Sequence, residues 1–253
     1  MKVKKIMYRL DDNAMRSIEK QTVDEGGLFI EKWNLKKKSK CLVCVEPNSK
    51  SLFFMVPILK DKKRFVQSLP VPSSLFLFQA KEFSKNASDL ALTFKDNVTA
   101  TLGMNESDNL YMIPEELYNS YLSYKISSLT SIVMFVESFV NSIIPEDFQI
   151  EDKKGEINGK IKVEQFWSLK DKLKTAIPKF KTIINKDEYK DAQNRFLQLN
   201  KLRNSFIHLK TTLDSKNMDP YLAHFEELIN LDLNISISQT ENLVRLIDST
   251  YFS

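Results

Sequence analysis

The second half of the chain has the hydrophobic pattern of a helical bundle. Between residues 113 and 253, apolar side chains recur every three or four positions, a spacing that places them on one face of an α-helix. Pro145 and Pro178 end two of these periodic stretches, and Asp219-Pro220 supplies an N-cap and a first-turn proline for another. The predicted helices cover residues 120–144, 163–177, 187–213 and 221–230, with a fifth beginning near Ser238.

The first part of the chain has a different pattern, in which short apolar runs rich in Val, Phe, Leu and Ile alternate with turn residues. Runs that flank short turns predict two hairpins, and the whole pattern predicts about five to seven strands. Alternation over 75–78 indicates that Phe76, Phe78 and Phe83 belong to the core of a strand rather than to a base-stacking surface. The predicted strands are 28–33, 40–46, 51–59, 90–95 and 98–102, with one short helix near 11–19.

These two patterns predict an α+β protein with two domains. A mainly-β N-terminal domain is expected over residues 1–112, followed by an all-α bundle over 113–253. The polar segment 104–114, closed by a proline, is the linker that we expect between them. Each half of the 253-residue chain is long enough to bury a hydrophobic core of its own.

The third predicted helix carries the most informative motif, Arg203-Asn204 followed by His208, in a chain with only two histidines. Asn204 and His208 are four residues apart and therefore share one face of the helix. Arg203 lies about 140° around the helix axis from His208. The two side chains can reach one phosphate from two sides, or meet their counterparts across a dimer.

These side chains have the chemistry that RNA cleavage without a metal requires. His208 titrates near neutral pH and can act as a general acid or a general base. Arg203 offers a permanently charged fork that fits phosphate oxygens and stabilises the charge of the transition state. Asn204 can hydrogen-bond the phosphate or orient the imidazole. A single helix has one such histidine, so a pair requires two copies of the chain.

The motif resembles the R-x(4–6)-H motif of HEPN domains (higher eukaryotes and prokaryotes nucleotide-binding), in the form with Asn directly after Arg. The resemblance covers roughly residues 114–253 and includes a Glu137-x-x-x-Asn141 pair on the first long helix. It implies an all-α, HEPN-like bundle that acts as a homodimer with a composite, metal-independent site. Glu137 and Asn141 would line that cleft and orient Arg203 or His208.

The resemblance therefore predicts an endoribonuclease that cleaves RNA, in the setting of a toxin or an antiviral defence effector. The N-terminal domain, which resembles no family, would recognise RNA, sense a trigger or restrain the nuclease, and an inhibitory or trigger partner is possible. Two alternatives remain open. One is a non-catalytic dimerisation or adaptor module, and the other is a nucleotide-sensing module that uses the same groove without cutting.

Charge is distributed unevenly and suggests where RNA would bind. Residues 1–112 carry 19 basic and 13 acidic residues, a net charge of +6, whereas residues 113–253 have a net charge of −2. Lys170 and Lys174 on the second predicted helix, and Lys210 beside the motif, are candidate RNA contacts. HEPN toxins that are paired with a nucleotidyltransferase antitoxin often have a tyrosine for adenylylation at the position of Lys210, so this chain does not support that mode of control.

The remaining composition predicts no cofactor, no metal and no membrane span. Cys41 and Cys44 lie three apart on a predicted strand and face opposite sides, which favours buried reduced thiols over a disulfide or a zinc site. The apolar stretch over 132–144 is interrupted by Glu137 and other polar residues, and the N-terminus lacks the apolar core of a signal peptide. A cytoplasmic protein is expected.

Overall fold

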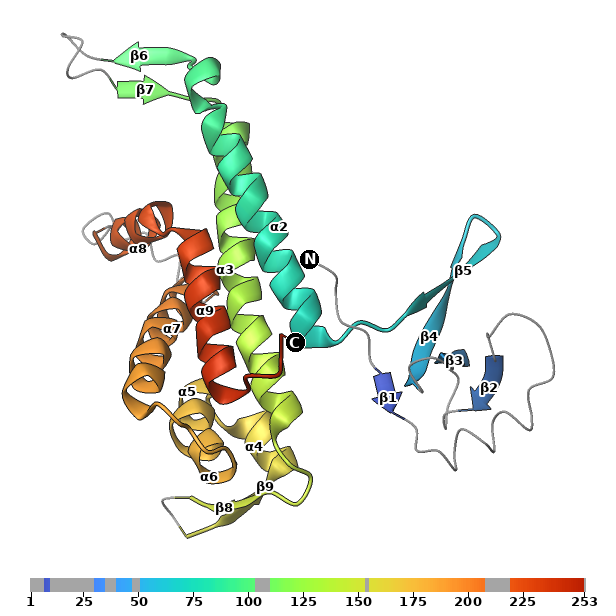
Figure 1. Cartoon of the computed structure of the whole chain (residues 1–253). Coiled ribbons are helices and arrows are strands. Elements are labelled where there is room, and N and C mark those ends of the chain that lie inside the picture. Colours follow the sequence, from blue (N-terminus) through green and yellow to red (C-terminus); the bar gives the residue numbers. More distant parts are fainter. Residues whose placement is uncertain are drawn as a thin grey trace. The chain divides into compact units, whose positions relative to one another are not determined.

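The computed structural model describes residues 7–9, 30–34, 40–46, 51–102, 110–152, 155–207 and 219–252. Figure 1 shows the elements, which belong to two compact units, residues 1–75 and 76–253. Of the residues described with their side chains, 70% lie in helices. The short helix predicted near 11–19 lies outside the described residues.

In the first unit, the described strands pair antiparallel in the order β1-β4-β3-β2, and β5 pairs with the second half of β4, from Met55 to Lys60. The predicted hairpin around residues 47–50 is present, since Glu46 pairs with Ser51. Asp61 and Lys62 form the tight turn into β5, and both have positive φ angles, as a two-residue hairpin loop requires. The strands are β1 (Met7–Arg9), β2 (Ile30–Asn34), β3 (Lys40–Glu46), β4 (Ser51–Lys60) and β5 (Lys63–Ser68).

The prediction of an α+β fold with a mainly-β domain over 1–112 is wrong, because the described chain is mostly helical. Helix α2 (Pro72–Leu92) and the 3₁₀ helix η1 (Phe94–Asn97) occupy much of the second half of that range. A short apolar run such as 75–78 fits either a strand or a buried helix. The buried side of α2 consists of Leu77 and of the small residues Ala80, Ser84 and Ala87, which recur at helical spacing. This side of the helix therefore has no stripe of large apolar side chains. Phe76, Phe78 and Phe83 therefore lie on a helix and not on a strand.

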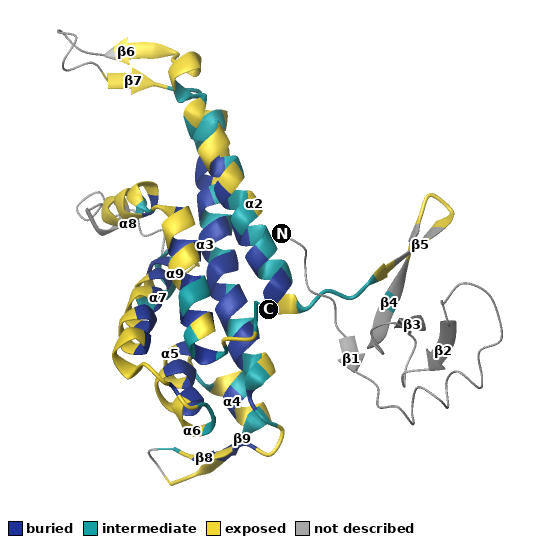
Figure 2. Cartoon of the chain, in the orientation of Figure 1, coloured by how far each residue is buried: buried dark blue, intermediate teal, exposed yellow. Residues whose placement is uncertain are grey.

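Helix α3 (Glu115–Ile143) is the central element of the second unit, and α2 lies along it (Figure 1). Ser128 Oγ on α3 donates a 2.8 Å hydrogen bond to the carbonyl oxygen of Ala80, so small residues allow the two helices to approach closely. The rings of Phe83 and Tyr124 stack at 6.2 Å. Buried residues extend along α3 in Figure 2, as expected for a helix covered on several sides.

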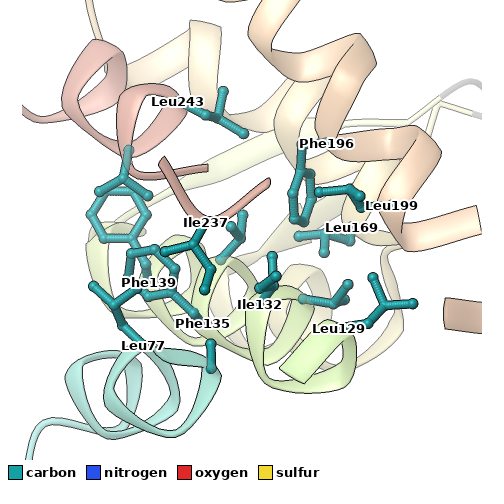
Figure 3. Close-up of a cluster of buried hydrophobic side chains, with 14 of the residues drawn as sticks. Leu77, Leu129, Ile132, Phe135, Phe139, Leu169, Phe196, Leu199, Ile237 and Leu243 are labelled. Carbon is teal, nitrogen blue, oxygen red and sulfur yellow. The ribbon is translucent and has the colours of Figure 1, made fainter. Parts of the chain in front are cut away.

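Three further helices cover α3: α7 (Lys186–Ile207), α8 (Asp219–Asn230) and α9 (Leu233–Ile247). Their apolar side chains complete the core shown in Figure 3, where Leu129, Ile132, Phe135 and Phe139 of α3 meet side chains from α2, α7 and α9. Lys125 of α3 is buried and donates to the carbonyl oxygens of Ile229 and Leu231, at 2.7 and 2.9 Å, where α8 ends. Helix α9 begins earlier than predicted, because the side chain of Asp232 caps it by accepting from Ile235 N.

The second predicted helix, 163–177, is two helical pieces. Helix α4 (Lys160–Phe166) ends before Ser168, whose side chain accepts from Asp171 N and caps the next piece. That piece runs through α5 (Leu169–Asp171), the π-helix η3 (Lys172–Ala176) and α6 (Ile177–Phe180). Pro178 lacks an N–H and would clash with the preceding turn of an α-helix, so the wider π-turn carries the helix past it.

Two small antiparallel ribbons complete the second unit. Strands β8 (Gln149–Glu151) and β9 (Ile157–Gly159) pair ahead of α4. Strands β6 (Ala100–Leu102) and β7 (Leu110–Met112) pair at the far end of the α2–α3 helix pair (Figure 1). The predicted hairpin of 90–95 with 98–102 is therefore wrong: 98–102 contributes a strand, but its partner is β7.

Among the described residues, α3 is the one helix long and apolar enough to cross a membrane by length and composition. Half of its most apolar stretch is buried against the rest of the fold. The central helix of a folded bundle has the same properties, so this feature is weak support for a membrane span.

Candidate functional site

Arg203 and Asn204 lie on the last turn of α7 that the structure describes. Leu199 and Leu202 are buried on the core face of this helix, and they fix the rotation of the turn that carries the motif. Both motif side chains are half-buried. Arg203 Nη1 donates a 3.0 Å hydrogen bond to Asn204 Oδ1, so the amide holds one arm of the guanidinium group beside its own helix.

A second atom of the same guanidinium group, Nε, differs from Nη1 in its surroundings. Arg203 Nε is buried, and among the described residues it makes no hydrogen bond. A buried donor without an acceptor costs about 1–3 kcal/mol, so such a group is expected to have a functional reason or a missing acceptor. An anionic oxygen is the acceptor that a guanidinium group binds most strongly. Nε itself is closed to solvent, so a phosphate that binds Arg203 must approach this half-buried side chain through its other donor atoms.

His208 and Lys210 lie outside the described residues, because the structure describes α7 only as far as Ile207. The predicted angular relationship between Arg203 and His208 around the helix axis therefore stays a prediction. The second histidine, His224, is half-buried on α8.

Glu137 and Asn141 of α3 are half-buried, and the described contacts place Asn141 in a different network from the motif. Asn141 Oδ1 accepts a 2.9 Å hydrogen bond from Lys172 Nζ, and the same ammonium group donates to the carbonyl oxygen of Glu164 at 2.7 Å. Among the described residues, no hydrogen bond or ion pair connects Glu137 or Asn141 with Arg203. The suggested role of this pair in orienting Arg203 remains a prediction without a described contact.

Lys172 is the polar residue that the sequence pattern did not single out. Its side chain is 1% exposed, whereas its neighbours Lys170 and Lys174 are exposed. Burial lowers the pKa of Lys172, and the carboxylates of Glu137 and Glu164 partly oppose this shift. The sequence did hold one sign that Lys172 is buried, namely its position between Leu169 and Ala176 on the apolar face of the helix.

The described residues contain no group of three or more His, Cys, Asp or Glu side chains that could hold a metal ion. The polar groups brought together are instead the Arg203–Asn204 pair and, separately, the Lys172–Asn141 pair. Comparison of this chain with family models, with curated proteins and with solved structures finds no match.

Proposed function

We propose that this chain is a metal-independent endoribonuclease of the HEPN type. The observation that supports the proposal most directly is the hydrogen bond from Arg203 Nη1 to Asn204 Oδ1, which holds the half-buried guanidinium group in position. A charged group that its neighbours hold in position is what recognition of a phosphate requires. The helical bundle around α7 also supports the proposal, because the resemblance implies an all-α bundle.

In the proposed mechanism, Arg203 binds the oxygens of the phosphate at the scissile bond and stabilises the added negative charge as the 2′-hydroxyl attacks. His208 takes the proton from that hydroxyl, or gives one to the leaving oxygen. Asn204 keeps the guanidinium group in a single orientation. One chain supplies one motif histidine, so two copies of the chain, forming a homodimer through the helical bundle, supply an acid and a base.

The test is cleavage of labelled total RNA and transfer RNA in EDTA by the purified protein, beside Arg203→Ala and His208→Ala. Each variant has a matched control in the same unit: Arg195→Ala on the exposed side of α7, and His224→Ala on α8. Cleavage by the wild type and both controls, lost in the two motif variants and leaving 2′,3′-cyclic phosphate ends, supports the proposal. Cleavage that survives in the motif variants would show that these residues are not the site.

The second candidate, a non-catalytic adaptor or dimerisation module, is favoured by the exposed apolar surface of β7. Leu110, Tyr111 and Met112 are 68%, 63% and 50% exposed, and large exposed apolar patches commonly mark interaction sites. A protein that forms a stable dimer, yet cleaves no RNA with or without added cellular extract, would support this candidate over the nuclease.

A further inference from the structure

A surface pocket of about 570 Å³ lies where α6 leads into α7. Lys179, Lys181 and Lys186 line it, together with Phe180, Thr182 and Tyr189. Tyr189 is buried and its hydroxyl donates to the carbonyl oxygen of Leu173, so this residue is a fixed wall. The pocket is therefore a concave site with a rigid aromatic wall, and its charged groups are the flexible side chains of three lysines.

The chain concentrates positive charge in this region. Residues 170–190 contain seven lysines and three acidic residues, in a half of the chain whose net charge is −2. Lys172 is buried, which leaves six lysines at the surface. Lys181 lies 3.7 Å from a carboxylate oxygen of Asp248, but in the described part of the chain Lys179 and Lys186 have no carboxylate within ion-pair distance. The pocket thus offers ammonium groups that are not neutralised.

The composition of the pocket favours a phosphate backbone over bases as its ligand. Phe180 is half-buried in a T-shaped contact with Phe148, with ring centroids 5.2 Å apart, and Tyr189 is buried, so neither aromatic ring of the pocket is fully exposed for stacking on a base. Lysines act as flexible point charges, which suit phosphodiester groups of any sequence. Thr182 is exposed and adds a hydroxyl donor of the kind that contacts phosphate oxygens.

We propose that the pocket of Lys179, Lys181 and Lys186 binds the backbone of single-stranded RNA, as a docking site separate from Arg203. The inference rests on the proposed function for the identity of the polymer. Lys186 and Arg203 lie near opposite ends of α7, and 17 residues at 1.5 Å each separate them by about 25 Å along its axis. An RNA must therefore be several nucleotides long to occupy both places, and a dinucleotide substrate cannot use the docking site.

The first experiment measures binding of a labelled single-stranded RNA by fluorescence anisotropy, with His208→Ala in every protein so that no RNA is cut. Replacing Lys179, Lys181 and Lys186 together by Gln is expected to weaken binding by on the order of tenfold. Loss of three phosphate contacts should also lower the slope of log affinity against log salt by about 2, at roughly 0.7 per contact. Replacement of the same three residues by Arg should retain the affinity and the slope.

Matched variants show whether a loss of RNA affinity comes from this pocket or from the lower net charge of the protein. Lys179→Gln with Lys186→Gln leaves the Lys181–Asp248 pair intact, and it should lose part of the affinity. Lys160→Gln with Lys162→Gln removes the same net charge from α4, where both lysines already pair with carboxylates, and it should bind RNA as the parent does. Equal weakening by the two double variants would overturn the docking site.

The two proposals fail in distinguishable ways. If the lysine variants bind RNA normally while Arg203→Ala and His208→Ala abolish cleavage, the docking site is wrong and the nuclease stands. If the lysine variants lose RNA binding but the wild-type protein cleaves nothing, the docking site stands and the nuclease is wrong. Binding of anionic phospholipid vesicles through these lysines, without measurable RNA binding, would assign the pocket to a membrane surface and overturn the inference.

Discussion

The ammonium group of Lys172 lies 2.9 Å from the amide oxygen of Asn141 and joins the π-turn of η3 to the central helix α3. The same group reaches the carbonyl oxygen of Glu164 at 2.7 Å, near the end of α4. One buried side chain therefore connects three helical segments. The half-buried Asn141 is part of a structural network as well as part of the E-x-x-x-N pattern.

Replacing Lys172 by Met should destabilise the fold by about 1–3 kcal/mol, because it leaves the oxygens of Asn141 and Glu164 without their donor. The measurement is urea unfolding at neutral pH. Lys170→Met, at an exposed position on the same helix, is the control and should change the free energy of unfolding by less than about 0.5 kcal/mol. Equal stability of the two variants would show that the buried ammonium group is not a structural connection.

The same lysine predicts a dependence of stability on pH. Its pKa in the folded state lies below the ordinary value of 10.5, chiefly because of burial. Between the two pKa values the unfolded chain binds more protons, so the free energy of unfolding should rise with pH in this alkaline window. Below the folded-state pKa, Lys172 is charged in both the folded and the unfolded state, so the full cost of burying its ammonium group lowers the free energy of unfolding.

Unfolding measured from pH 7 to pH 11 checks this relationship, with Lys172→Met as the comparison. The alkaline rise should be smaller in the variant than in the wild type. Lys125, whose pKa burial also lowers, should retain its own contribution in both proteins. A fall in wild-type stability over the same window that the variant does not show would contradict the assignment.

A fragment of residues 113–253 should fold poorly, whereas one of residues 70–253 should unfold cooperatively. The shorter fragment lacks α2, whose Leu77, Ala80 and Ala87 are buried against the bundle. It also loses the ion pair of Lys81 with Glu241 at 2.7 Å and the hydrogen bond of Ser84 with Asn234 at 2.9 Å. Thermal unfolding followed by circular dichroism distinguishes the fragments, and equal melting temperatures would show that α2 is dispensable.

Asn204→Ala should lower RNA cleavage by about tenfold to a hundredfold, because Arg203 then loses the acceptor that holds its guanidinium group. The effect should appear mainly in kcat, and Asn204→Asp should restore the acceptor and part of the rate. Asn194→Ala, at an exposed position on α7, is the matched control. Normal cleavage by Asn204→Ala would exclude a positioning role.

The sequence pattern predicted the helices of the bundle well wherever large apolar residues recur, as in α3 and α7. It failed at α2, because the buried side of this helix includes Ala80, Ser84 and Ala87, whose small side chains produce no hydrophobic period. It also failed to separate Lys172 from its exposed neighbours, since burial of a lysine depends on acceptors from distant segments. Nothing local in the sequence specifies that Asn141 and the carbonyl oxygen of Glu164 would supply them.

The π-turn of η3 contains one residue more than an α-helical turn, as the hydrogen bond from Ile177 N to Lys172 O shows. In an uninterrupted α-helix, every residue after the turn would stand about 100° away from its present direction around the axis. Lys179 of the pocket lies on α6, the helix that continues from this turn, so the insertion of a single residue determines which way Lys179 faces. Lys172 stands at the start of the turn, so a deletion of one residue within η3 would rotate the segment that follows relative to Lys172 and rearrange the packing of that segment.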